Sequence, residues 1–298
     1  MAPRAPFQVA LVQMKMQAEP AINLDAACAH VHEAASHGAK VVCLPELFRT
    51  PYFCQKEDVA LFDLAEPVPG PSTAALGQVA RRDGVVVLAS LFERRAAGLY
   101  HNTTAVIGSD GSVLGRYRKT HIPDDPNYYE KFYFAPGDLG FPVFATEPGQ
   151  LGVLVCWDQW YPEAARLVAL GGADVIFYPT AIGWHPDEKA GNGTAQRDAW
   201  RTVQRGHAIA NGVYVAAVNR VGREAPAGPP GLEFWGGSFL CDPQGVVMAE
   251  ASADREEILY GTVDPAHLED VRRNWPFLRD RRIDAYQGID RRFGDKLS

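Results

Sequence analysis

Short apolar runs alternate with helix-like stretches along this chain, and this order constrains the fold more than any other feature. Residues 7–14, FQVALVQM, and 40–44, KVVCL, predict two strands, and the Ala-rich stretch 22–38 between them predicts a helix. A strand, a helix and a strand in this order indicate a βαβ crossover. The sequence therefore predicts an α/β fold.

The alternation continues to about residue 250. A helix is predicted over 72–83, a buried strand over 85–91 and a hairpin over 102–117. The second half repeats the theme without repeating the sequence: we expect strands over 151–155, 175–178 and 213–218, helices over 162–170 and 196–211, and a hairpin over 236–249. Because no linker separates the halves, residues 1–298 are expected to form one domain.

Three segments lack periodicity. Residues 120–142 and 183–193 are expected to be long functional loops. Residues 272–298 form a basic, aromatic tail. Its large apolar side chains would be costly to expose, so we expect the tail to pack on the body or on a neighbouring subunit. These side chains are Trp275, Phe277, Leu278 and Tyr286.

Composition excludes several classes of function. The formal net charge is -7 and the basic residues are scattered, which argues against nucleic acid as a partner and favours a small molecule. No apolar run reaches the roughly 18 residues that a membrane span requires, so no membrane association is expected. The first residues do not resemble a secretory leader, and a cytoplasmic location is expected.

The five cysteines show no spacing typical of a metal site or a disulfide framework. This spacing argues against a structural zinc site. Cys156 differs from the others because it lies between the strand-like LGVLV and a helix-forming segment. At such a junction, free backbone N–H groups and the positive helix end favour a thiolate and can hold an oxyanion. Most cysteines are nonetheless small apolar core residues.

A cysteine nucleophile needs a base, and no histidine has suitable neighbours. Glu46 follows the strand KVVCL in an apolar setting that is expected to raise its pKa. Lys119 stands at the end of another predicted strand, and Glu130 lies among aromatic residues. Each residue also has a simpler interpretation, because loop glutamates are usually solvated and basic strand ends usually protect a sheet edge.

Three segments together resemble the signature motifs of the nitrilase superfamily of carbon–nitrogen hydrolases. They are LPELFRTPY around Glu46, RYRKTHIP around Lys119 and GVLVCWDQWYPEAAR around Cys156, in the order and spacing of that family. One such motif is weak evidence, whereas three in sequence, each with the required residue, are specific. The resemblance extends over essentially the whole chain.

The resemblance implies a four-layer α/β/β/α sandwich of two mixed sheets flanked by helices. It also implies a catalytic triad of Glu46, Lys119 and Cys156 without a cofactor, with Glu130 as a second glutamate that holds the lysine and contacts the substrate. Members of the family associate through their sandwich faces and exchange C-terminal tails. A homo-oligomer, dimeric or larger, is therefore expected.

Within the superfamily, three segments are most similar to the branch that hydrolyses N-carbamoylputrescine in polyamine biosynthesis. They are YYEKFYFAPGDLGFPVF, CWDQWYPEAARLVALGGADVIFYPTAIGW and RVGRE. Carbamoylputrescine carries an ammonium, which should meet acidic residues or aromatic faces. The loops expected around the pocket carry such side chains, and we interpret these as substrate-binding: Tyr52, Asp125, Trp157, Trp184, Asp187 and Glu188.

Several alternatives remain. The branch that includes β-ureidopropionase, or another amidase of the superfamily, shares part of the pattern. A catalytically inactive binding or scaffold protein would be expected to lack one triad residue, and none is replaced. A metal-dependent amidohydrolase would need histidines with ligand spacing, which the sequence does not show.

Overall fold

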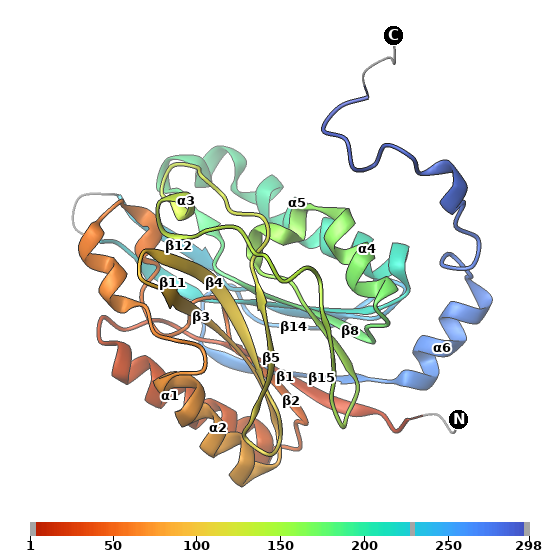
Figure 1. Ribbon diagram of the computed structural model, residues 1–298, viewed down its shortest axis with the longest axis horizontal. Helices are drawn as coiled ribbons and strands as arrows, with labels where there is room; N and C mark the ends of the chain where they lie inside the picture. Colours follow the sequence, from red (N-terminus) through yellow and green to blue (C-terminus); the bar gives the residue numbers. More distant parts are fainter. Residues whose placement is uncertain (1–3, 227–229, 295–298) are drawn as a thin grey trace.

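The computed structural model describes residues 4–226 and 230–294, and over these it is a sandwich of four layers (Figure 1). Two six-stranded mixed sheets lie face to face, and helices cover their outer sides. The predicted α/β/β/α architecture is therefore confirmed.

The first sheet contains the N-terminal βαβ crossover. Strands β1 (Phe7–Gln13) and β2 (Val41–Cys43) are parallel and are joined by α1 (Pro20–Ser36). Strand β3 (Val86–Ala96) continues the parallel part after α2 (Pro71–Asp83). The sheet has the order β15-β1-β2-β3-β4-β5, completed by β4 (Leu99–Ile107), β5 (Val113–Arg118) and the edge strand β15 (Glu257–Val263).

The second sheet has a parallel centre of β7, β8 and β10, covered by α4 and α5. Its strands are β6 (Val143–Ala145), β7 (Gln150–Val153), β8 (Val175–Thr180), β10 (Tyr214–Asn219), β13 (Phe239–Cys241) and β14 (Val247–Glu250). The helices are α4 (Pro162–Leu170) and α5 (Pro186–Asn211). A small third sheet joins β9 (Gly183–Trp184), β11 (Val221–Glu224) and β12 (Leu232–Trp235). Short helical turns complete the fold: α3 (Glu130–Tyr133) and the 3₁₀ turns Phe53–Gln55, Val59–Leu64, Cys156–Trp160 and Ile283–Ala285.

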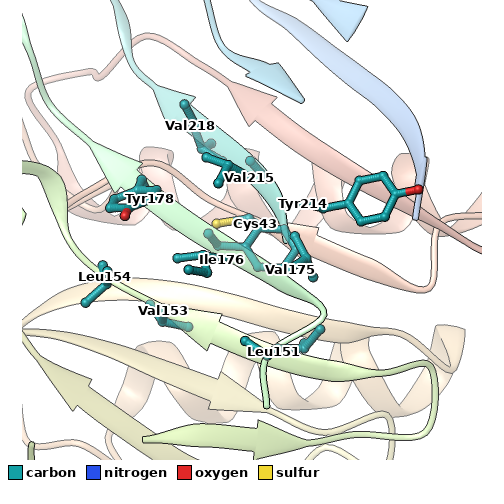
Figure 2. Close-up of a cluster of buried hydrophobic side chains, with 14 of the residues drawn as sticks. Cys43, Leu151, Val153, Leu154, Val175, Ile176, Tyr178, Tyr214, Val215 and Val218 are labelled. Carbon is teal, nitrogen blue, oxygen red and sulfur yellow. The ribbon is translucent and has the colours of Figure 1, made fainter. Parts of the chain in front are cut away.

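Alternation along the strands explains the layers. In β1, Val9 and Leu11 belong to the apolar cluster between the sheets, whereas Ala10 and Val12 belong to the cluster under α1 and α2. Successive side chains of a strand point to opposite faces, so a run that is apolar at every position must be covered on both sides. Figure 2 shows Cys43 of β2 among side chains of β7, β8 and β10. Cys43 is therefore a core residue.

One predicted loop is largely helical. Residues 183–193 were expected to lack regular structure, yet they comprise β9 and the first turns of α5. Pro186 occupies the first turn of the helix, where its missing N–H costs nothing. Gly191 and Gly193 weaken the helical pattern in the sequence, and the Trp184 indole, which donates to the Gly193 carbonyl at 2.9 Å, stabilises the turn.

The C-terminal segment begins with α6 (Pro265–Asn274), which is fixed to the body. Arg272, the first residue of the predicted tail, lies within α6 and donates to the carbonyls of Ala173 and Gly212. Beyond α6 the chain rises alongside the sandwich (Figure 1), and Tyr286 and Ile289 line a surface pocket together with residues of α4 and α5. Trp275 and Phe277 are about half exposed. The predicted tail extends to residue 298, and residues 295–298 lie outside the described part.

Candidate active site

Three of the predicted site residues follow the ends of strands at one edge of the sandwich. Glu46 lies just beyond β2, Lys119 directly follows β5, and Cys156 lies just beyond β7. Binding sites of open α/β sheets form at the carboxyl ends of strands, where loops can bring side chains from distant parts of the chain together. Here the two sheets contribute to one site.

Lys119 forms two buried ion pairs. Its Nζ lies 2.8 Å from Oε1 of Glu46 and 2.6 Å from Oε2 of Glu130, and all three side chains are essentially inaccessible to solvent. Burial acts to lower the pKa of Lys119, but the two carboxylates outweigh it and hold this pKa well above its usual value. The lysine is therefore a fixed ammonium.

Glu46 has one engaged oxygen and one free oxygen. Oε1 accepts hydrogen bonds from Lys119 and from Nδ2 of Asn102, at 2.7 Å for the latter. Oε2 is buried and accepts no hydrogen bond from any residue in the described ranges. Because buried polar atoms are normally paired, this free oxygen indicates a position where the carboxylate can accept a proton from another group.

Glu130, at the start of α3, is held by Lys119 and by the Tyr52 hydroxyl, which donates to Oε1 at 2.6 Å. Burial raises the pKa of Glu130 to about 7, with a further increase from Glu46 and opposing effects from Lys119 and Tyr52. Its charge therefore changes near neutral pH, unlike that of an ordinary glutamate.

Cys156 occupies a strained turn. It is the first residue of the 3₁₀ turn Cys156–Trp160, and its φ of 42° lies in the left-handed region. A residue other than glycine pays about 1–2 kcal/mol for this conformation. Strain of this kind persists where the surrounding structure fixes the backbone, and it is common at active sites. The thiol is 5% exposed, and its Sγ lies 4.0 Å from the carbonyl oxygen of Ala181.

Burial and neighbouring charges act on the Cys156 thiol in the sense opposite to a helix end. Burial raises the pKa of its thiol well above the usual value, and the negative charge of Glu46 adds to this effect more than Lys119 offsets it. The predicted thiolate would require a stabilising helix end, but the turn here is only a five-residue 3₁₀ turn, and α4 begins after it at Pro162. These surroundings favour the thiol over the thiolate, so a nucleophilic Cys156 needs a base beside it.

A cavity of about 620 Å³ opens onto these residues. Glu130 and Cys156 lie at its base, and of the predicted substrate-binding residues it is lined by Asp125, Trp157, Asp187 and Glu188. The other lining residues are Pro123, Pro126, Tyr128, Trp160, Ile182, Gly183, His185, Gln196, Ala199 and Trp235.

Two predicted substrate-binding residues do not line this cavity. Tyr52 lies behind the site, where its hydroxyl is bound to Glu130. Trp184 packs against Trp235 with ring centroids 5.3 Å apart and supports the cavity wall from outside. Both aromatic side chains carry a polar group that is used within the protein, so in this structure they support the site without facing the cavity.

Comparison with known families decides what kind of site this is. The family model for carbon–nitrogen hydrolases matches residues 8–273. The chain belongs to the carbon–nitrogen hydrolase family. The resemblance to the nitrilase superfamily is therefore confirmed, and the protein is a hydrolase that acts on carbon–nitrogen bonds of amides.

Individual relatives match this hydrolase over nearly its whole length. N-carbamoylputrescine amidase of Arabidopsis thaliana is 43% identical, covering 94% of this chain and 93% of the relative. Citrullinase of Francisella tularensis is 41% identical, covering 97% and 100%. A crystal structure of a carbon–nitrogen hydrolase from Helicobacter pylori G27 superimposes with a TM-score of 0.94 at 45% identity, covering 97% of this chain and 100% of that one.

The cavity of this hydrolase has an acidic mouth. Three of its lining residues are exposed carboxylates: Asp125 in the loop before α3, and Asp187 and Glu188 in the first turn of α5. None of the residues that line it is a lysine or an arginine. Three tryptophan side chains and Ile182 add apolar surface to the lining. The cavity thus combines an apolar channel with a negatively charged entrance.

Sequence reasoning missed two residues that hold the hydrolase site together. Arg220 is fully buried, and its guanidinium donates to the carbonyls of Glu46 and Leu47 and to the carboxylate of Glu224. Glu224 in turn accepts from the backbone N–H of Tyr52. Both residues belong to the segment RVGRE that contributed to the resemblance, but charged side chains beside a strand normally indicate a solvated edge.

The described part of this hydrolase offers no alternative metal centre. Within residues 4–226 and 230–294, no group of three or more histidine, cysteine, aspartate or glutamate side chains is arranged to hold a metal ion. Over the same residues, no helix is both long and apolar enough to cross a membrane.

Proposed function

We propose that this hydrolase cleaves N-carbamoylputrescine to putrescine, ammonia and carbon dioxide. The observation that carries the proposal is a cavity lined by Cys156 and Glu130 in its buried part and by exposed acidic side chains at its mouth. A carbamoyl group fits the base, and the ammonium at the far end of a four-carbon chain fits the mouth. The similarity to N-carbamoylputrescine amidases supports this substrate. The activity belongs to polyamine biosynthesis.

The proposed reaction begins with proton transfer from Cys156 to Glu46. The sulfur then attacks the carbamoyl carbon, and Lys119 and the N–H of Trp157 stabilise the negative charge on the carbamoyl oxygen. An amine leaves with the proton from Glu46, and a covalent acyl intermediate on the sulfur remains. Glu46 next takes a proton from one water molecule, whose oxygen attacks the acyl carbon. The carbon–sulfur bond breaks, the sulfur regains the proton from Glu46, and the carbamic acid that leaves decomposes to carbon dioxide and the second amine. Over the cycle one water is consumed, and putrescine, ammonia and carbon dioxide are formed.

Glu130 is proposed to orient two partners in this cycle. Its carboxylate binds Lys119 at 2.6 Å and also lines the cavity. It can therefore hold the lysine ammonium in place and accept a hydrogen bond from a substrate nitrogen.

Citrulline hydrolysis is the second candidate, because one close relative is a citrullinase. Citrulline carries a carboxylate as well as an ammonium at its far end, and N-carbamoyl-β-alanine, the substrate of β-ureidopropionase, carries a carboxylate alone. A carboxylate should meet an arginine or a lysine, whereas the residues at the mouth are acidic. The cavity therefore favours carbamoylputrescine.

A substrate panel tests the proposal. Ammonia release from N-carbamoylputrescine should exceed release from citrulline, N-carbamoyl-β-alanine, simple amides and nitriles in kcat/KM. Cys156→Ala protein is the control for contaminating activity. A preference for either carboxylate-bearing substrate would contradict the substrate assignment, and no turnover of any member would favour a binding or scaffold role.

We further infer that the hydrolase is a homo-oligomer in the cytoplasm. Its C-terminal segment exposes Trp275, Phe277 and Ile283, and an apolar surface of this kind is typical of an interface. All five cysteines are free thiols, as is usual in a reducing compartment. Removal of residues 276–298 should lower the mass measured by light scattering, and an unchanged mass would contradict the role of the tail.

A further inference from the structure

The carboxylate of Asp158 lies at the junction of the two sheets and accepts four hydrogen bonds. Oδ2 accepts from the backbone N–H of Val155 at 2.9 Å and from the Tyr117 hydroxyl at 2.7 Å. Oδ1 accepts from the backbone N–H of His121 at 2.9 Å and lies 2.7 Å from its Nδ1. The side chain is fully buried. A buried carboxylate with this many donors is held in one orientation.

One carboxylate contact and one backbone hydrogen bond of Asp158 shape the turn that carries Cys156. The Val155 N–H donates to the Asp158 side chain, and the Asp158 N–H donates to the Val155 carbonyl at 3.0 Å. The chain between these residues includes the left-handed backbone of Cys156. These reciprocal bonds close the turn around Cys156, which stabilises a conformation that an L-residue rarely adopts.

The other contacts fix the chain on both sides of Lys119. Tyr117 precedes the lysine by two residues in β5 and His121 follows it by two, and both bind Asp158. The His121 ring also stacks on Tyr161, which follows the Cys156 turn, with ring centroids 3.7 Å apart. A single carboxylate therefore connects the backbone that presents Lys119 with the backbone that presents Cys156.

We propose that Asp158 is the positioning residue that sets Cys156 relative to Lys119 and Glu46. This inference rests on the proposed function, because it assigns the geometry of that same reaction. Asp158 does not line the cavity, so it acts through the residues that it holds. A shift of about 1 Å between reacting groups costs roughly 100-fold in rate.

The test is the variant Asp158→Asn, compared with Asp174→Asn as a matched control. Asp174 is also buried, and it accepts hydrogen bonds from the Gln150 N–H and from Arg4, at the end of β7 that is distant from Cys156. Each oxygen of Asp158 accepts from two donors. In the asparagine variant the side-chain oxygen can accept from only one of these two sets of donors, and the NH₂ group, itself a donor, would face the other set. Asp158→Asn should lower kcat about 10- to 100-fold with KM nearly unchanged, whereas Asp174→Asn should keep the wild-type kcat.

A second measurement does not depend on the substrate. Iodoacetamide should alkylate Cys156 at least about tenfold more slowly in Asp158→Asn than in Asp174→Asn, as followed by peptide mass mapping at equal thermal stability. If the wild type fails to hydrolyse N-carbamoylputrescine, the proposed function is wrong. The alkylation rates still test whether Asp158 positions Cys156, because they do not depend on the substrate. Wild-type kcat and wild-type alkylation in Asp158→Asn would overturn the inference.

A milder variant covers the case in which Asp158→Asn does not fold. Tyr117→Phe removes one of the four bonds, and Tyr214→Phe is its control, since the Tyr214 hydroxyl binds the backbone of Asp264. Tyr117→Phe should lower kcat and the alkylation rate by about three- to tenfold, less than Asp158→Asn, because three of the four hydrogen bonds to Asp158 remain. Equal rates in the two phenylalanine variants would overturn the inference.

Discussion

Lys119 and Glu46 meet through one carboxylate oxygen only: Nζ lies 2.8 Å from Oε1, and Oε2 accepts no hydrogen bond from the described residues. This division separates two tasks. Oε1 fixes the lysine, while Oε2 remains free to exchange a proton with Cys156 or water. A glutamate used only to neutralise a lysine would be expected to have both oxygens bonded.

Glu46→Gln should therefore lower kcat by about 10²- to 10⁴-fold, the usual contribution of a general base, while the protein remains folded. An amide retains an oxygen that can accept from Lys119 and Asn102 but cannot take the thiol proton. Glu66→Gln is the control, because Glu66 is also buried and is bound by Ser72 and Arg49. Ammonia release and circular dichroism measure the two properties. Activity of Glu46→Gln near that of the control would exclude Glu46 as the base.

The pH profile should show the titration of Glu130. Its pKa is raised to about 7, and only the ionised form fully holds the Lys119 ammonium, so kcat/KM should fall as the pH drops below about 7. The hydrogen bond from Tyr52 lowers this pKa, so Tyr52→Phe should move the acid limb to higher pH. Tyr133→Phe, whose hydroxyl binds the Lys56 carbonyl, should leave it in place. A shift to lower pH in Tyr52→Phe would contradict the assignment.

Cys156 should behave as a protonated thiol at rest. Because burial and Glu46 raise its pKa, the wild type and Cys156→Ser should show the same thiolate absorbance in the ultraviolet near neutral pH. Lys119 lowers this pKa, so Lys119→Ala should make alkylation of Cys156 slower than in the wild type. A thiolate signal at neutral pH that disappears in Cys156→Ser would contradict this prediction and show that the turn stabilises the thiolate of Cys156.

The sequence predicts the layers well because successive side chains of a strand point to opposite faces of its sheet. Val9 to Val12 are apolar at every position, so both faces of this strand must be buried by other elements. The motifs likewise place Glu46, Lys119 and Cys156 at strand ends. The structure adds what long-range contacts decide: Tyr52 binds Glu130, and burial beside Glu46 raises the pKa of the Cys156 thiol.

Residues such as Arg220 and Asp158 show why the rest could not be predicted. Each is a charged residue next to a strand or turn, where solvent exposure is the usual outcome, and each is fully buried here. Their partners lie far away in sequence: Arg220 binds the carbonyls of Glu46 and Leu47, and Asp158 binds Tyr117 and His121. A local pattern contains no information about such partners.

The acidic mouth yields a prediction about substrate charge. Asp125→Asn and the pair Asp187→Asn with Glu188→Gln should each raise KM for N-carbamoylputrescine about two- to fivefold with little change in kcat, because these exposed side chains attract the distant ammonium weakly. Added salt should reduce the difference from the wild type. Asp124→Asn is the matched control, since Asp124 is exposed beside Asp125 but does not line the cavity. KM for an uncharged amide should not change in any of these variants, and a parallel rise for that amide would show that the acids act on the shape of the cavity and not on charge.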